Sequence, residues 1–350
     1  MSILLVPTGT AASAGHDKAS ADLDGTFSYL AALVQRDHDQ DEMAPYLVEA
    51  AVASGKDPAT WPPAASALSL LPGADDMQPG LIHFLRPAHA LAVAGRLGPE
   101  SNETATILAA FAGGQFGATS LLNDDIWVLL TLPRAGIPRD DARVQADAGF
   151  LLAHQGADGG WSWATDGPSE TDETGMALEA LAGVGRLGAD VAERALAFVA
   201  RQTSPDGGVA LVKPGAANCD STAWSIRASA AAGRPPPPQA WAFLASLRNA
   251  DGTYQFTRGG NSNVICTIEA ATVLGMALRE GWDLSGYPGG KTAAGGGLPA
   301  LAALAGATVR RRSGRRIGPS MSGIVLKTLR GKTRVAHLCQ RWWHGWARAG

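Results

Sequence analysis

The residues whose types and spacing could do chemistry form an acidic run, Glu170-Thr171-Asp172-Glu173-Thr174. Three carboxyl side chains lie within four residues, and carboxyls gathered in this way can bind a ligand through hydrogen bonds. The same residues can serve the backbone instead, because an Asp at the start of a helix accepts hydrogen bonds from its first unpaired N–H groups. From the residue types alone, Asp172 is either a helix cap or a functional carboxyl.

Residues that could bind a metal ion do not gather in the sequence. The cysteines Cys219, Cys266 and Cys339 are scattered and match neither a disulfide framework nor a metal motif, so we expect small buried side chains. Histidine is missing between His154 and His337. A zinc site built from Asp, Cys and His would therefore lack its third ligand there, and we expect no metal site and no cofactor.

A repeated segment positions the acidic run. An apolar helical stretch followed by Asp-Gly recurs three times, with the Asp-Gly pairs 48 and 45 residues apart. Each copy continues with a loop, a polar start and a small-residue helix that ends in Gly, which predicts helices over 172–185, 220–233 and 262–275. Asp-Gly favours a turn, and a Gly after a helix is typical of a left-handed cap.

Weaker copies at 29–55, 87–113 and 123–136 precede these three, so residues 21–285 have room for about six units of roughly 45 residues each. Stacked helical hairpins either continue as a solenoid or close on themselves, and six units of this length suit closure. The sequence predicts an all-α fold, an α/α toroid (an α6/α6 barrel), with a disordered basic tail. Equivalent positions would then gather round one mouth as a polar rim of Glu42, Asn123, Asp172 and Asp220.

The same residues carry a resemblance to a known family. Gln155 followed by Asp158-Gly159-Gly160-Trp161 resembles the Gln-Trp motif of squalene-hopene and related cyclases. The stretch from there through Thr174 resembles the region that leads into their DxDDT acid motif. The repeats cover most of residues 21–285, and the specific match covers residues 155–181. The resemblance implies a terpenoid cyclase/prenyltransferase toroid that binds or cyclises an isoprenoid in its central cavity.

The resemblance also assigns roles to individual residues. In the family, the middle Asp of the motif protonates an alkene or epoxide, and a neighbouring carboxyl keeps it protonated. By position Asp172 would be this acid, with Glu170 and Glu173 flanking it where the family has Asp. Aromatic faces wall such cavities because they stabilise carbocations, and Leu122-Asn123-Asp124-Asp125 is a second partial copy of the motif. The predicted substrate-binding residues are Trp161, Trp163, Asp124, Asp220 and Trp224.

Three features of the chain keep other functions open. Triterpene cyclases need a second toroid-like domain, and the chain has room for one only. Aromatic residues make up only 6% of the sequence, and an Asp that recurs in several repeats is typical of a cap.

Prenyltransferase β-subunits use a single toroid, as do cobalamin carriers, which bind without catalysis. A structural surface protein would use the toroid as a scaffold. An apolar cavity with Asp172 pointing inward would favour the enzyme, a polar or shallow cavity the carrier, and a plugged cavity the scaffold.

The two ends of the chain differ from its body. All 32 acidic residues and 17 of the 29 basic residues precede position 286, so the body carries a net charge of −15 and the tail is purely basic. The sequence predicts a signal-peptide-like remnant over 1–19, the toroid over 20–285, and a Gly-rich linker with a basic tail over 286–350. We expect a secreted or cell-surface protein, with a cytoplasmic location as the alternative. The tail is expected to contact a membrane surface rather than nucleic acid.

Overall fold

A computed structural model describes residues 9–36, 43–63, 66–71 and 80–288, of which residues 9–13 are described for the backbone alone. The sequence predictions for residues 1–8, Glu42, Cys339 and everything from residue 289 onward lie outside this part of the chain. In the part that is described, no helix is both long enough and apolar enough to cross a lipid bilayer.

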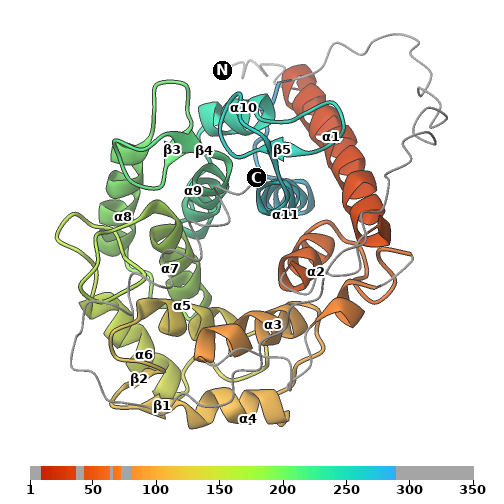
Figure 1. The fold of residues 1–350 in the computed structure, drawn as a ribbon. Coiled ribbons are helices and arrows are strands. Elements are labelled where there is room, and N and C mark those ends of the chain that lie inside the picture. Colours follow the sequence, from red (N-terminus) through yellow and green to blue (C-terminus); the bar gives the residue numbers. More distant parts are fainter. Residues whose placement is uncertain (1–8, 37–42, 64–65, 72–79, 289–350) are drawn as a thin grey trace, which may run out of the picture. The chain divides into compact units, whose positions relative to one another are not determined.

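Six helices form an inner ring in which each helix lies against the next along the chain (Figure 1). The last of them, α11, lies against the first, α2, and this contact closes the ring. In chain order the inner helices are α2 (Ala44–Ala53), α3 (Leu81–Val93), α5 (Leu122–Thr131), α7 (Thr171–Gly183), α9 (Cys219–Ala231) and α11 (Val264–Glu280).

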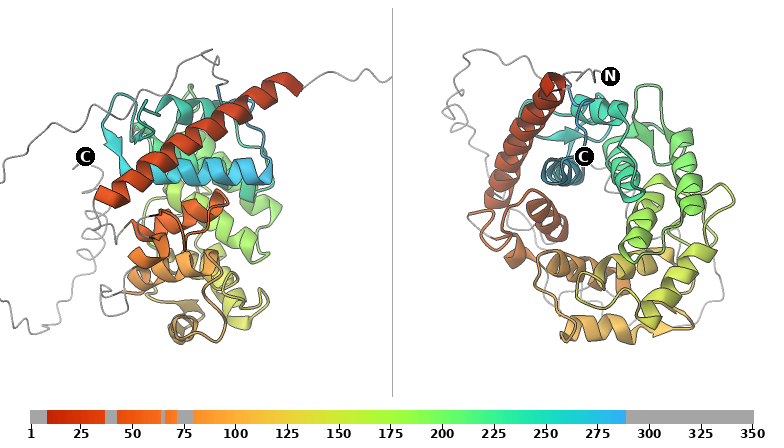
Figure 2. Two further views of the ribbon diagram at one scale, coloured as in Figure 1. Left: turned by 90° about the vertical axis from the view of Figure 1, so that its right-hand side faces the viewer. Right: turned by 180° about the vertical axis from the view of Figure 1, so that it is seen from behind.

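An outer layer surrounds this ring (Figures 1 and 2). Each outer element packs on the inner helix that precedes it in the ring, and α1 packs on α11. The predicted α/α toroid is therefore confirmed, with one departure: the second outer element is a single 3-10 turn, η1. The outer elements are α1 (Gly9–Arg36), η1 (Ala67–Leu70), α4 (Asn102–Ala109), α6 (Ala142–Ala153), α8 (Ala189–Gln202) and α10 (Pro238–Ser246).

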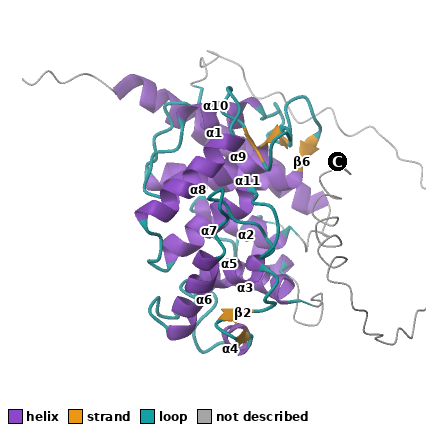
Figure 3. Ribbon diagram, turned by 90° about the vertical axis from the view of Figure 1, so that its left-hand side faces the viewer, coloured by secondary structure: helices purple, strands orange, loops and turns teal. Residues whose placement is uncertain are grey.

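Three short antiparallel hairpins connect outer helices to inner helices, toward one side of the ring (Figure 3). In each of the last three repeats, the backbone N–H of one residue between the outer and the inner helix donates to a Thr on the inner helix 13 positions later. The hydrogen bonds run from Trp161 to Thr174, from Val209 to Thr222 and from Tyr254 to Thr267, at 2.9, 3.0 and 2.9 Å. The hairpins pair β1 (Phe111–Ala112) with β2 (Gln115–Phe116), β3 (Val209–Ala210) with β4 (Ala217–Asn218), and β5 (Tyr254–Gln255) with β6 (Ser262–Asn263).

These threonine bonds fix which residues are equivalent in the last three repeats. Two positions before each Thr stand Asp172, Asp220 and Ile265. The sequence alignment had placed Ser262 at this position, which is wrong by three residues. The carboxyl at the start of the inner helix therefore recurs in α7 and α9 but not in α11.

Glycines end the inner helices where the sequence predicted them in two repeats, Gly185 with φ 71° and Gly233 with φ 67°. The same prediction for Gly275 is wrong, because α11 continues to Glu280 and Gly281, with φ 69°, is its left-handed cap. Gly275 serves the ring differently. A Cβ at this position would lie 2.9 Å from the backbone carbonyl carbon of Ala53, so the missing side chain lets α11 approach α2 closely.

The first and last described segments contact each other through polar side chains. Helix α1 runs through the boundary predicted between residues 19 and 20, and Ala19 is fully buried. Tyr287 donates a hydrogen bond of 2.9 Å to Asp22 on α1, and Arg248 forms an ion pair of 3.3 Å with the same carboxylate. Tyr287 is itself buried, so the chain packs on α1 beyond the boundary predicted at residue 285.

Candidate functional site in the inner ring

Asp172 and Asp220 do not cap their helices. The residue before α7 is Glu170, and its side chain makes no capping hydrogen bond, while Asp172 is the second residue of the helix. Helix α9 is capped by Asn218, which accepts the N–H of Ser221 at 2.8 Å, and Asp220 is again the second residue. The interpretation of both aspartates as caps is therefore wrong, and their burial needs another explanation.

Three neighbouring inner helices present equivalent polar side chains. The first residue of α5, of α7 and of α9 donates its backbone N–H to a backbone carbonyl in the segment just before the next inner helix, at 2.8, 3.0 and 2.8 Å. The second residues, Asn123, Asp172 and Asp220, therefore occupy equivalent places. In each of them Oδ1 is buried, and within the described part of the chain it has no hydrogen-bond partner. These three unpartnered oxygens form a row that could accept hydrogen bonds from a ligand, and the two carboxyls among them can also hold a proton.

Asp172 lies in surroundings that favour its neutral form. The residue is only 4% exposed. Burial raises the pKa of Asp172 to about 7; a hydrogen bond with Ser221 opposes this rise, and the charges of Glu170 and Glu269 add to it. This carboxyl can therefore carry a proton near neutral pH, where an ordinary Asp is ionised.

Glu173, which flanks Asp172, also lies in surroundings that favour its neutral form. Burial raises the pKa of Glu173 well above its usual value, and the charges of Glu170 and Asp172 and a hydrogen bond with Glu170 raise it further. Glu170 is 8% exposed, and Glu173 is half-buried at the same end of α7. The acidic run is thus a set of three interacting carboxyls that share fewer than three negative charges.

Asp220 completes the row on the next helix. Burial raises the pKa of Asp220 well above its usual value, and the charge of ionised Asp172 raises it further. Arg227 and Arg86 act in the opposite direction but do not reverse the shift. Asp220 is 5% exposed.

A layer of buried charge crosses the ring two helical turns beyond these carboxyls. Its centre is Arg227, which is 3% exposed. The Nη2 atom of Arg227 lies 2.8 Å from Glu49 on α2 and 2.8 Å from Glu179 on α7. Its Nη1 atom lies 3.8 Å from Glu269 on α11. One guanidinium therefore joins four of the six inner helices.

This layer was not predicted from the sequence, although the spacing of its residues carried a signal. Glu179 lies seven residues after Asp172, and Arg227 lies seven residues after Asp220, so each pair shares one face of its helix. Burial works to raise the pKa of Glu179, but Arg227 and Arg134 outweigh burial and lower it to about 2. The carboxyl row near Asp172 favours neutral groups, whereas Glu179 beside Arg227 stays ionised. Glu269, at the edge of this layer, differs from Glu179, because burial and the charge of Asp220 raise its pKa well above its usual value despite Arg227.

The predicted tryptophans have different surroundings. Trp161 is fully buried, and its indole N–H donates to the carbonyl of Leu151 at 2.8 Å, so it packs in the core between helices. Trp163 is half-buried, and its backbone carbonyl accepts the N–H groups of the first two residues of α5. Trp224 is 5% exposed, and the Arg227 guanidinium lies 3.9 Å from its ring centroid. Trp224 therefore belongs to the charged layer.

Asp124 belongs to a separate acidic group on the outer side of α5. Its Oδ2 atom accepts the N–H of Ala118 at 3.4 Å, and burial raises the pKa of Asp124 to about 6 against that hydrogen bond. The next residue, Asp125, is fully buried with Asp147 of α6. Both accept the N–H of Phe116, at 3.0 and 3.1 Å. Asp124 follows Asn123 in the chain and corresponds to Glu173 rather than to the acid position.

Cys219 and Cys266 are free and buried, as the sequence predicted. Among the described residues, no group of three or more His, Cys, Asp or Glu side chains could hold a metal ion.

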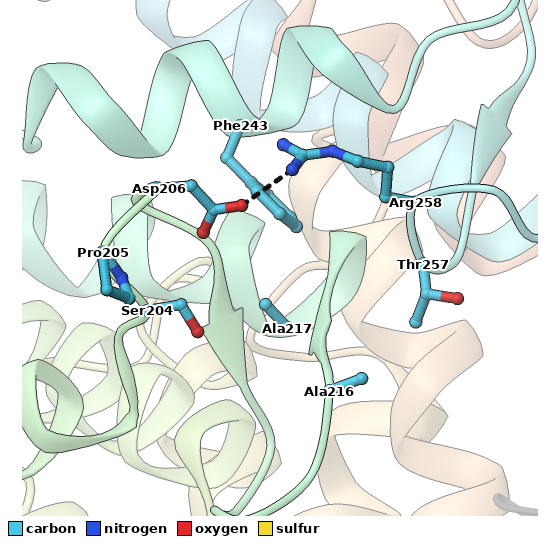
Figure 4. Close-up of a pocket in the computed structure, with 8 residues that line it drawn as sticks. All are labelled: Ser204, Pro205, Asp206, Ala216, Ala217, Phe243, Thr257 and Arg258. Atoms are coloured by element: carbon cyan, nitrogen blue, oxygen red, sulfur yellow. Dashed lines mark hydrogen bonds and ion pairs between the residues drawn. The ribbon is translucent and has the colours of Figure 1, made fainter.

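A cavity of about 520 Å³ lies away from these carboxyls, between the loops of the last repeats (Figure 4). The exposed ion pair between Asp206 and Arg258, at 2.9 Å, spans it, and the ring of Phe243 forms part of its wall.

Known proteins with a similar fold are terpene cyclases. No protein-family model matches the chain. Its sequence is 32% identical to drimenyl diphosphate synthase of Streptantibioticus cattleyicolor over 166 residues, which are 44% of this chain and 31% of that protein. The chain therefore spans about a third of the curated relative that it matches.

Two solved structures of the type II terpene cyclase MstE from Scytonema, both of variants, share the fold. The apo form has a TM-score of 0.51 and 15% sequence identity, and the match covers 76% of this chain and 98% of that one. A second form, in complex with geranylgeranyl dihydroxybenzoate as substrate, has a TM-score of 0.50 and 14% identity, with the same coverage. The predicted resemblance to terpenoid cyclases is thus confirmed for the fold, and one toroid accounts for nearly all of the MstE chain.

Proposed function

We propose that this protein is a cyclase of the class II terpenoid type, in which Asp172 protonates a carbon–carbon double bond or an epoxide of an isoprenoid. The observation that carries the proposal is the state of this one carboxyl. Asp172 is buried in the inner ring, its Oδ1 has no partner among the described residues, and its pKa is raised to about 7.

An acid of this kind must keep its proton until the substrate arrives. At pH 7 an ordinary Asp would be protonated in roughly one molecule in a thousand, whereas a pKa of about 7 leaves about half of the molecules ready. When Asp172 gives up its proton, the hydrogen bond with Ser221 stabilises the carboxylate. The start of helix α7 also favours negative charge at this position.

The relatives support a proposal for the kind of substrate. Drimenyl diphosphate synthase is named for the diphosphate that it makes, and the MstE complex holds geranylgeranyl dihydroxybenzoate as substrate. A linear polyprenyl chain on a polar head group is therefore the substrate class that we propose. The nearly complete match to MstE also supports the proposal that one toroid is sufficient for the activity.

The test is turnover of a defined panel by the full chain and by Asp172→Asn. The panel holds farnesyl diphosphate, geranylgeranyl diphosphate, squalene and a cobalamin, with products identified by gas chromatography and mass spectrometry. We expect cyclised product from one prenyl compound and a loss of at least about 100-fold in Asp172→Asn. Asp206→Asn, at the surface cavity, is the matched control and should keep full activity.

Two results would oppose the proposal. Full turnover by Asp172→Asn, with an unchanged circular dichroism spectrum, would remove Asp172 from the reaction. Tight retention of the cobalamin without turnover of any prenyl compound would favour the alternative of a secreted, non-catalytic carrier.

A further inference from the structure

The buried charged layer around Arg227 contains a donor and an acceptor that lie side by side without a hydrogen bond. The Nη1 atom of Arg227 lies 3.8 Å from the Oε2 atom of Glu269, which is too far for a hydrogen bond. Both atoms are buried, and neither has a hydrogen-bond partner within the described part of the chain. The two residues are only 3% and 4% exposed. Leaving buried polar groups unpaired costs free energy, and a ligand that paired with both atoms would recover it.

Other contacts hold the rest of the Arg227 side chain in place. Its Nη2 atom lies 2.8 Å from both Glu49 and Glu179, and its Nε atom donates to Glu179 at 2.9 Å. The guanidinium also lies against the ring of Trp224. Helices α2 and α7, which carry the two glutamates, are three places apart in a ring of six (Figure 1), so this guanidinium reaches into the middle of the ring. Nη1 is the nitrogen of this fixed group that remains for a ligand.

The pair of Arg227 and Glu269 lies close to the proposed acid. Glu269 follows Ile265, the residue of α11 that is equivalent to Asp172, by four positions, which is about 6 Å along the helix axis. Residues four positions apart share one face of a helix. Glu269 therefore faces the same interior as Asp172, one helical turn further along the ring. The charge of Glu269 also acts on Asp172, which supports this placement.

A hydroxyl group fits this pair better than an anion does. Its oxygen can accept a hydrogen bond from Nη1 of Arg227, and it can either donate to Glu269 or accept from that carboxyl when it is protonated. The ions of the layer already balance, because Arg227 pairs with Glu49 and Glu179, and Arg134 pairs with Glu179 at 3.1 Å. A diphosphate would add negative charge beside two carboxylates in a buried place, where like charges repel strongly.

We propose that Arg227 and Glu269 bind a hydroxyl group of the isoprenoid, so that the ligand is a neutral, hydroxyl-bearing prenyl compound rather than a prenyl diphosphate. This inference rests on the proposed function, because it places the reacting double bond at Asp172 and the hydroxyl group at Arg227 and Glu269. A folded prenyl chain is then fixed at two points, the acid and the hydroxyl site.

The first test measures binding to the unchanged full chain. The three probes share one prenyl chain: farnesol, farnesyl diphosphate, and the hydrocarbon in which a hydrogen replaces the hydroxyl group of farnesol. Trp224 packs on the Arg227 guanidinium, so tryptophan fluorescence can report binding. We expect farnesol to bind at least about 10-fold more tightly than either other probe, because the hydrocarbon leaves both polar atoms unpaired and the diphosphate is repelled. Equal or weaker binding of farnesol, or none, would overturn the inference.

The second test removes the acceptor. In Glu269→Leu the preference for farnesol over the hydrocarbon should fall to about 2-fold or less, whereas Glu269→Gln, whose amide can still pair with a hydroxyl, should keep most of it. A merely structural role would instead weaken both probes equally. Glu280→Gln, at the exposed end of the same helix, is the matched control and should bind as the full chain does.

The outcomes separate this inference from the proposed function. An unchanged preference in a Glu269→Leu protein with a native circular dichroism spectrum would overturn the hydroxyl site. If that variant does not fold, the three probes on the full chain decide the question. A fully active Asp172→Asn would refute the proposed function, while the preference for a hydroxyl group is measured by binding and does not depend on turnover.

Discussion

Replacing Asp147 by Asn should change how the stability of the toroid depends on pH. Asp125 and Asp147 are fully buried and share the N–H of Phe116. Burial raises the pKa of Asp125 to about 6, although a hydrogen bond with Asp147 works to lower it. Burial also raises the pKa of Asp147 well above its usual value, and Asp125 raises it further. The two carboxyls therefore hold one proton between them at neutral pH.

The direction in which stability changes with pH follows from these pKa shifts. Because the folded pKa values lie above the unfolded ones, the folded chain binds protons more tightly, and stability falls as pH rises from the unfolded value through the folded one. For Asp125 alone the shift of roughly two units corresponds to about 3 kcal/mol lost between acidic pH and pH 8. An Asn at position 147 removes one titrating group, and its amide N–H can donate to Asp125 in place of the shared proton.

The assay is urea unfolding of the full chain and of Asp147→Asn between pH 4 and pH 8. We compare the free energy of unfolding of Asp147→Asn with that of the full chain at each pH. We expect this difference to shift in favour of the variant by about 1 to 3 kcal/mol between pH 4 and pH 8. Comparing the two proteins at each pH cancels the other buried carboxyls, and Asp140→Asn, an exposed acid nearby, is the control. A difference between Asp147→Asn and the full chain that does not vary with pH would refute the shared-proton reasoning.

Two further predictions concern the packing of the repeats. Gly175→Ala should lower the free energy of unfolding by about 1 to 3 kcal/mol, because its Cβ would lie 2.9 Å from the backbone of Trp224. The control Gly183→Ala, in open space on the same helix, should raise that free energy by up to about 1 kcal/mol. A rise at both positions in urea unfolding would contradict the close contact. Thr222→Val should cost about 1 to 3 kcal/mol, because the buried N–H of Val209 loses its acceptor. An unchanged thermal midpoint for Thr222→Val would show that this bond does not hold the repeat together.

The features that the sequence predicted well depend on neighbours in the chain. The turn at Asp158-Gly159 and the caps at Gly185 and Gly233 follow from local backbone preferences, so the helical hairpins and their number could be read directly. One cause of the raised pKa of Asp172 could also be predicted, because Glu170 stands two residues before it, whereas its burial, the larger cause, could not.

The features that were missed depend on residues far apart. Arg227 meets Glu49 across 178 positions, and no local pattern announces an ion layer shared by four helices. The wrong register at Ser262 has a related cause. The sequence offered several polar residues near the start of α11, and only the hydrogen bond between Tyr254 and Thr267 shows which position is equivalent to Asp172.

The contact between α11 and α2 determines how this fold can come apart and how it can form. In an open array of repeats the end units have one neighbour each and can fray. In a closed ring every unit has two neighbours, so no repeat can leave until two interfaces have broken, and unfolding is expected to be all-or-none. Closing the ring brings Ala53 against Gly275, a contact between distant parts of the chain. Because such long-range contacts form slowly, ring closure is expected to limit the folding rate.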